Sequence, residues 1–274
     1  MPMPVSPARI IKRHARHLYR VNMGLLWLYS FLVAFPGLLW DGVCLLFPRI
    51  PAPVPALISF IMLILTTPLA LGWMRLLYLL FMSDTSDRLP PNTLGELFHY
   101  YRRFLQTWKG VSLFTGVITA ASIVSYLLNY VQHTFPIDAA PSWLQAGVIF
   151  LSLAFLCAML FLICRLLTAP YLFFRKEQLP PVHLLRESLT YSAGYFGFIL
   201  GFVLSMCLLV LIFPVLFGLL AALDIWVSSF SLWTANFLFS VFILPYILLA
   251  VAGLASILMP SEKELAKQNK KKTC

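Results

Sequence analysis

The stretch VPALISFIMLILTTPLALGWMRLL, residues 54–77, decides the fold class of this chain. It contains one charged side chain, Arg75, close to its end. A helix needs about 20 predominantly apolar residues to cross the hydrocarbon core of a bilayer, and this stretch meets that length. The stretch therefore predicts a helix that spans a membrane.

The rest of the chain has a similar composition. Of its 274 residues, 61% are hydrophobic and 11% are charged, whereas soluble domains carry about 25% charged residues. This composition excludes an ordinary soluble enzyme, a disordered tail and a disulfide-rich secreted domain. The candidate spans are Met23–Phe47, Val54–Leu77, Gly110–Val131, Trp143–Leu167, Gly194–Leu220 and Phe230–Met259. The sequence thus predicts an all-α polytopic membrane protein with six transmembrane helices.

The first of these spans has an irregular sequence. Pro36-Gly37 interrupts it, and Asp41 lies near its far end. It fits either one kinked helix or a helix followed by a re-entrant piece. We expect Asp41 to be a loop residue beyond the helix; facing the bundle, it would be a candidate proton or cation site.

Basic residues predict the orientation. Of the 20 Lys and Arg residues, 19 precede the first span, surround the second and fourth connections or follow the last span, and only Arg49 lies on the other side. Because basic residues concentrate in cytoplasmic loops, both termini are expected in the cytoplasm, most simply of a bacterial cell membrane. The net charge of +10 then indicates contact with anionic lipid headgroups rather than with nucleic acid.

Three regions follow from this division. Residues 1–22 form a basic N-terminal segment in which Ala8–Val21 fits an amphipathic helix at the membrane surface. Residues 23–259 form the transmembrane domain, and residues 260–274 form a basic cytoplasmic tail.

The connection after the second span has its own helical pattern. The residues that share one face at helical spacing are Leu94, Leu97, Phe98, Tyr101, Leu105 and Trp108. The pattern starts just after Pro90-Pro91, a helix start signal. It predicts an interfacial amphipathic helix over residues 92–109, and the alternative is a helix packed under the bundle.

A shift of 90 residues aligns the two longer cytoplasmic connections. Arg75-Leu76-Leu77 then matches Arg165-Leu166-Leu167, and Leu89-Pro90-Pro91 matches Leu179-Pro180-Pro181. Leu94 matches Leu184 in the same alignment. The pattern predicts a parallel internal repeat of two helical hairpins, at about residues 54–131 and 143–220, each with a cytoplasmic interfacial helix. Parallel repeats occur in some transporters.

Arginines at helix ends are the candidate contact residues. Arg75 and Arg165 either extend to the cytoplasmic headgroups, bind lipid phosphate or pair with Glu96 and Glu187. The residues expected to contact lipid or a partner are Arg75, Arg102, Arg103, Arg165 and Arg175.

Two other functions need different residues. A transporter needs a polar cavity at the midplane, for which the candidate lining residues are Ser122, Ser125, Asn129 and Asn236. An enzyme acting on lipid needs a nucleophile or a metal near Arg75 and Arg165, and the sequence contains no HExxH, GxSxG or P-loop motif. We therefore expect no catalysis, no metal and no cofactor.

The leading hypothesis is a non-enzymatic membrane protein that assists or regulates a transport or envelope process. Its cytoplasmic face would contact anionic lipid or a membrane-protein partner. A small transporter with a cavity between the two hairpins is the alternative. Gly197-x-x-x-Gly201 would allow close helix packing, either within the chain or in a homo-oligomer.

Several motifs resemble one bacterial membrane family. They are Thr67-Pro68-Leu69 and the residues that follow to Phe104, Arg-x-x-x-Ala-Pro-Tyr at Arg165–Tyr171, Glu187-Ser188, and Pro245-Tyr246. Over about Pro68–Met259 the chain looks like the family called domain of unknown function 975. It is also similar, less closely, to the six-helix family around the YesL protein. Neither resemblance implies an established activity or any catalytic residue.

Overall fold

The computed structural model describes residues 7–47, 53–83, 87–89, 92–105, 107–108, 142–206, 208, 215 and 228–259. All the elements formed by these residues are helices, and none of these residues lies in a strand. The predicted all-α class is therefore confirmed over this part of the chain. The chain divides into two compact units, Met1–Phe104 with Gly201–Cys274, and Leu105–Leu200.

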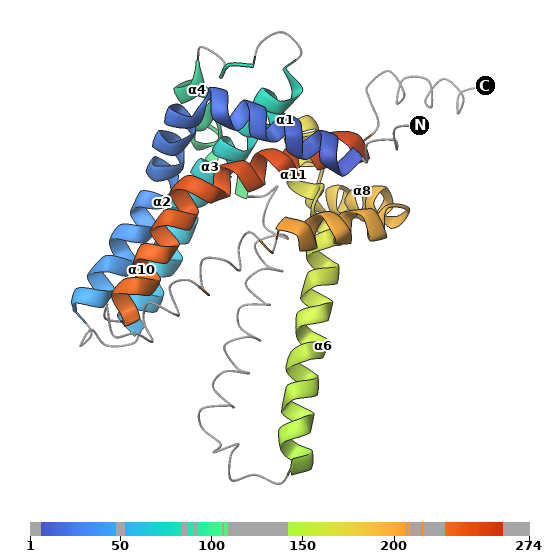
Figure 1. Cartoon of the computed structure of the whole chain (residues 1–274). Helices are drawn as coiled ribbons and strands as arrows, with labels where there is room; N and C mark the ends of the chain where they lie inside the picture. Colours follow the sequence, from blue (N-terminus) through green and yellow to red (C-terminus); the bar gives the residue numbers. More distant parts are fainter. Residues whose placement is uncertain are drawn as a thin grey trace. The chain divides into compact units, whose positions relative to one another are not determined.

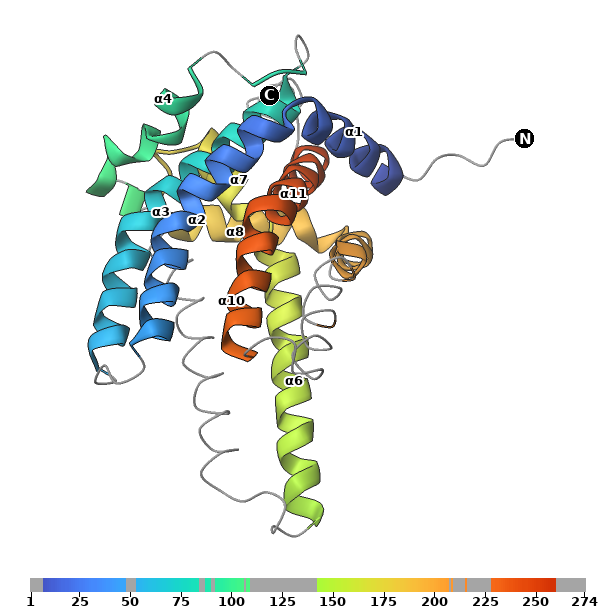
Figure 2. The same cartoon turned by 60° about the vertical axis from the view of Figure 1, so that its left-hand side comes forward.

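The described residues of the first unit form three long helical rods and a further helix that crosses one of them. Figures 1 and 2 both show α2, α3 and the α10–α11 rod side by side, with α1 leaving the end of α2 at an angle and crossing α11. Its elements are α1 (Pro7–Val21), α2 (Met23–Leu46), α3 (Pro53–Met82), α4 (Thr93–Leu97), the 3₁₀ helix η1 (His99–Tyr101), α10 (Ser228–Leu238), the π-helix η3 (Phe239–Ile243) and α11 (Leu244–Leu258).

Helix α2 runs without interruption through Pro36. The interpretation as a single helix is therefore confirmed for the first span. Proline removes only one hydrogen bond from the helical ladder, and membrane helices tolerate that loss. The expectation that Asp41 is a loop residue is wrong, because Asp41 lies within α2, where it is exposed.

Among the described residues, four helices are long and apolar enough to cross a membrane. They are Met23–Cys44, Leu57–Met82, Leu153–Arg175 and Trp233–Leu258. A bent pair, Pro181–Ala193 with Phe196–Met206, makes a fifth candidate if it is one span broken by a 94° bend. The predicted span Gly110–Val131 lies outside the described residues, so the count of six stays a prediction.

One face of α2 presents apolar side chains along the length of the span. The large side chains of this stripe are 40–53% exposed, and they are Leu25, Leu28, Leu32, Phe35 and Leu39. The opposite side buries Leu26 and Tyr29 against the unit. An apolar stripe of this length is costly in water and suits contact with lipid acyl chains.

The second unit is built on α6 (Ser142–Leu166), α7 (Ala169–Arg175) and α8 (Pro181–Ala193). Helix α8 packs against both α6 and α7. Its buried side is unusual for an amphipathic helix, because Ser188 and Ser192 are buried there together with Leu184. Polar residues are buried at low cost only when they are hydrogen-bonded, and these serines are.

The predicted interfacial helix at residues 92–109 is not continuous. Its described residues form α4, the single turn η1 and, after a turn at Arg102 and Arg103, further helical residues at 104–105 and 107–108. Leu97 and Tyr100 are buried, whereas Leu94, Phe98 and Leu105 are 55%, 48% and 77% exposed. The break in the helix separates these apolar residues into a buried set and an exposed set, so one interfacial amphipathic helix over residues 92–109 is not confirmed.

The aligned halves of the predicted repeat differ where both are described. Helix α3 runs on to Met82, but its counterpart α6 ends at Leu166 and a new helix begins at Ala169. Leu184 is fully buried, whereas its counterpart Leu94 is 55% exposed. Much of residues 110–131 and 207–220 lies outside the described part, so the repeat as a whole stays a prediction.

Candidate functional site

Helix α1 has one strongly basic face. Four arginines lie on it at spacings of four, three and four residues, and all are exposed: Arg9, Arg13, Arg16 and Arg20. The helix contains no acidic residue. The opposite face is apolar and buried through Ile11, Ala15 and Leu18, none more than 2% exposed. Such a helix joins an apolar docking face to a positively charged outer face.

The apolar face of α1 packs on protein. It contacts α11, where Gly253 leaves room for Ile11 and for Phe81 of α3. The ring of His14 meets Phe81 edge-on at 4.9 Å between centroids. The burial of this apolar face against α11 leaves the basic face exposed. The predicted place of this helix at the membrane surface stays a prediction.

Lys12 differs from the arginines of α1. Its Nζ donates a hydrogen bond of 2.5 Å to the Ser205 hydroxyl and lies 5.4 Å from the centroid of the Phe202 ring. Burial lowers the pKa of Lys12, because desolvation disfavours the charged amine. Lys12 therefore fastens α1 within the first unit and is not part of the exposed basic face.

Asn22 holds the junction between α1 and α2. It is 5% exposed, and its Nδ2 donates to the carbonyl of Leu18 at 2.9 Å and to that of Asp87 at 2.7 Å. Its Oδ1 accepts the backbone N–H of Leu89 at 3.0 Å. One amide thus fixes both residues that flank Arg88, and the His17 Nε2 lies 3.1 Å from the Asp87 carboxylate.

A series of two hydrogen bonds joins α1 and α2 to the π-helix. The Nε1 of Trp27 donates to the Tyr19 hydroxyl at 2.6 Å, and this hydroxyl donates to the Phe242 carbonyl at 2.6 Å. Burial raises the pKa of Tyr19, because desolvation disfavours the phenolate. The sequence predicted neither the π-helix nor these partners.

Arg75 is held between α3 and the short helices that follow. Its Nη1 lies 3.5 Å from the Glu96 Oε2, and its Cζ lies 5.9 Å from the centroid of the Tyr100 ring. The two paired side chains are 20% and 28% exposed. Of the three alternatives for Arg75, the structure contains the pairing with Glu96, and the pair links α3 to α4. Contact of Arg75 with lipid stays a prediction.

Close backbone contact lets α4 reach Arg75. A Cβ at Gly72 would collide with the carbonyl oxygen of Leu97 and lie 2.8 Å from its carbonyl carbon. Glycine is therefore needed for α4 to approach α3 so closely. Two hydroxyls also fasten this segment, because Tyr29 bonds Thr93 at 2.6 Å and Tyr101 donates to the Leu65 carbonyl.

Arg165 in the second unit is held differently. Its Nη1 donates to the Leu189 carbonyl at 3.3 Å, and its guanidinium lies 5.5 Å from the centroid of the Phe161 ring. Glu187 pairs instead with Lys176, at 2.7 Å. The predicted pairing of Arg165 with Glu187 is therefore wrong. The local sequence did not show that Lys176, at the end of α7, reaches Glu187.

The other predicted contact arginines are spread over both units. Arg102 and Arg103 are exposed just after η1, and Arg175 is half-buried at the end of α7. The sequence analysis did not include the four exposed arginines of α1 among its site residues. Their regular spacing was the signal that could have identified them.

The predicted cavity lies mostly beyond the described part of the chain. Ser122, Ser125 and Asn129 are outside the described residues, and Asn236 is exposed on α10, where its Oδ1 accepts the Ser240 hydroxyl at 3.4 Å. Within the described ranges, no three His, Cys, Asp or Glu side chains gather as a metal site requires. The transport cavity stays a prediction.

Comparison with protein-family models, with curated proteins and with solved structures finds no match. The resemblance to domain of unknown function 975 therefore rests on the sequence motifs alone.

Proposed function

We propose that this chain is a non-enzymatic integral membrane protein that gathers anionic lipid at its cytoplasmic face. Through that face it assists or regulates a transport or envelope process in a bacterial cell membrane. The observation that carries the proposal is the exposed arginine face of α1, which lies next to the start of the first candidate span. An anionic leaflet attracts each nearby Lys or Arg by about 1 kcal/mol.

The way α1 is fastened supports this function. Its apolar face is occupied by α11, and Asn22 and Tyr19 tie its C-terminal end to the unit. A basic helix held in this way keeps four positive charges at one place beside the bilayer. The lipid-binding surface is then already ordered before lipid binds. Binding is favoured because it does not cost the entropy of ordering a mobile helix.

The test compares lipid around two variants that lose the same positive charge. The full chain is reconstituted in nanodiscs of equal phosphatidylcholine and phosphatidylglycerol, and the lipid retained by the released protein is measured by native mass spectrometry. In one variant Arg9, Arg13, Arg16 and Arg20 become glutamine. In the control, Lys263, Lys267, Lys270 and Lys271 of the tail become glutamine.

We expect phosphatidylglycerol to be enriched around the wild-type protein and around the tail variant. The enrichment should fall at least threefold in the α1 variant and should weaken with added salt, because exposed charges are screened. An equal mixture around the wild-type protein, or an equal loss in both variants, would contradict a specific role for α1.

A further inference from the structure

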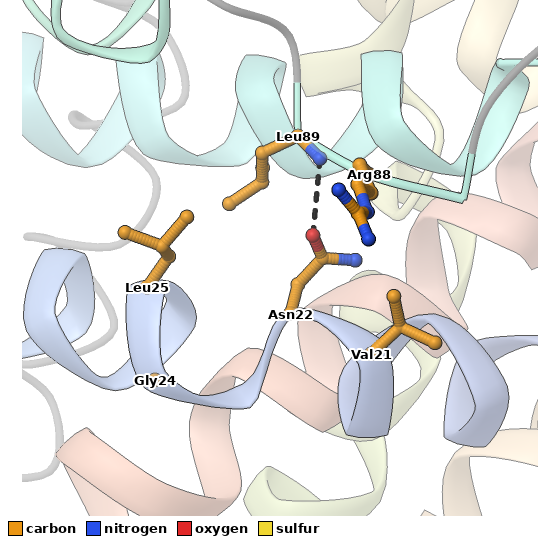
Figure 3. Close-up of a pocket in the computed structure, with 6 residues that line it drawn as sticks. All are labelled: Val21, Asn22, Gly24, Leu25, Arg88 and Leu89. Carbon is orange, nitrogen blue, oxygen red and sulfur yellow. Dashed lines mark hydrogen bonds between the residues drawn. The ribbon is translucent and has the colours of Figure 1, made fainter.

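A pocket of about 440 Å³ opens where α1 meets α2. Two segments distant in sequence form its walls, the helix junction and the short segment 87–89. The residues that line it are Val21, Asn22, Gly24, Leu25, Arg88 and Leu89. Figure 3 shows the Asn22 amide and the Arg88 guanidinium extending toward each other from the two walls.

The cationic wall of this pocket is fixed by the fold. Asn22 binds the carbonyl of Asp87 and the N–H of Leu89, so the backbone on both sides of Arg88 is tied to the start of α2. The Asp87 carboxylate, next to Arg88 in the chain, lies 3.1 Å from the His17 Nε2. A guanidinium held in a partly apolar pocket is well suited to a phosphate, because it can donate two parallel hydrogen bonds.

The pocket continues into an apolar surface. Leu25 lines the pocket and is 46% exposed, and it begins the exposed stripe that continues along the span through Leu28 and Leu32. A soluble phosphate compound would use only the cationic end of this arrangement. A phospholipid would use both, with its headgroup at Arg88 and an acyl chain along α2.

We infer that this pocket binds the phosphate headgroup of one anionic phospholipid from the leaflet that α1 faces. The inference deepens the proposed function, since it assumes that anionic lipid gathers at this face. The inference adds one saturable lipid-binding site to the diffuse electrostatic attraction between anionic lipid and the arginines of α1. Asn22 is a positioning residue for this site, and Arg88 provides the charge.

Gly24 allows the pocket to be filled without disturbing the protein. Gly24 lines the pocket, and a Cβ there would meet no neighbouring side chain or other element within 4 Å, so Gly24→Leu adds bulk at the pocket wall without a clash at its Cβ. Gly37 lies in the same helix and is equally open, so Gly37→Leu is the matched control. Arg88→Gln removes the charge, and Arg186→Gln removes one equivalent charge from an exposed residue of α8 that does not line the pocket.

The full-length protein is titrated with phosphatidylglycerol in detergent, and the lipid-bound forms are counted by native mass spectrometry. We expect the tightest-bound lipid to bind at least tenfold more weakly to Gly24→Leu and to Arg88→Gln. The Gly37→Leu and Arg186→Gln variants should bind that first lipid like the wild-type protein. Glycerol 3-phosphate, the soluble headgroup alone, should not compete at equal concentration.

Three results would overturn the inference. They are unchanged binding of the first lipid to Gly24→Leu, an equal loss in Gly37→Leu, and full competition by glycerol 3-phosphate, which would make the ligand a soluble phosphate. The nanodisc comparison separates this site from the proposed function. If enrichment around α1 persists while no single tight lipid is found, only the pocket fails; if both are absent, both fail.

Discussion

Replacing Gly72 by valine is expected to release α4 and η1 from α3 and to lower the free energy of unfolding by roughly 3 kcal/mol. Its Cβ would collide with the Leu97 carbonyl and lie 3.1 Å from the Glu96 carbonyl oxygen. Backbone atoms cannot swing aside as a side chain can. The segment would have to move away, exposing Leu97 and Tyr100 and separating Arg75 from Glu96.

Thermal unfolding and the labelling rate of a cysteine at position 97 measure this release. Leu97 is fully buried, so a maleimide should label Leu97→Cys slowly in the parent protein and much faster beside Gly72→Val. Gly37→Val is the control, since a Cβ there has no protein atom within 4 Å. Equal stability and equal labelling in the two valine variants would show that α4 does not dock on α3.

Replacing Gly253 by alanine is expected to loosen α1 from α11. The added Cβ would collide with the tip of the Phe81 ring and lie 2.9 Å from the Ile11 Cγ2. Overpacking of this kind costs about 1–3 kcal/mol. Since these contacts are with side chains, Phe81→Ala should relieve much of the cost when it is combined with Gly253→Ala.

Limited trypsin digestion measures this loosening. The exposed Arg13 and Arg16 are cleavage sites in α1, and a docked helix resists the unfolding that cleavage requires. Cleavage in α1 should be several-fold faster in Gly253→Ala than in Gly201→Ala, where the added Cβ meets no protein atom within 4 Å. The prediction fails if the double variant is cleaved no more slowly than Gly253→Ala.

The sequence predicts the helices well because their length and composition leave few alternatives. Long apolar runs predicted α2, α3, α6 and α11, and Pro36 did not end α2. Contacts between elements were the harder part. No local pattern shows that Gly72 admits a carbonyl of α4, or that the helix after residue 92 breaks at Phe98.

Part of the site was also predictable from the sequence. The pairing of Arg75 with Glu96 followed from charge and from proximity along the connection. The partner of Glu187 was Lys176 and not Arg165, because the break after Leu166 starts a separate helix that brings Lys176 to α8. The pocket depends on Asn22 binding a segment 65 residues later, which no motif encodes.

The orientation of α1 is the most direct test of a lipid-gathering cytoplasmic face. Single cysteines are placed at Ile10 on α1 and at Phe47 beyond α2, which are 58% and 62% exposed, in a chain whose five native cysteines have been replaced. In intact bacteria a membrane-impermeant maleimide should label Phe47→Cys at once and Ile10→Cys only after the cells are permeabilised. Labelling of Ile10→Cys in intact cells, with Phe47→Cys protected, would place the arginines of α1 outside the cell and contradict the proposed function.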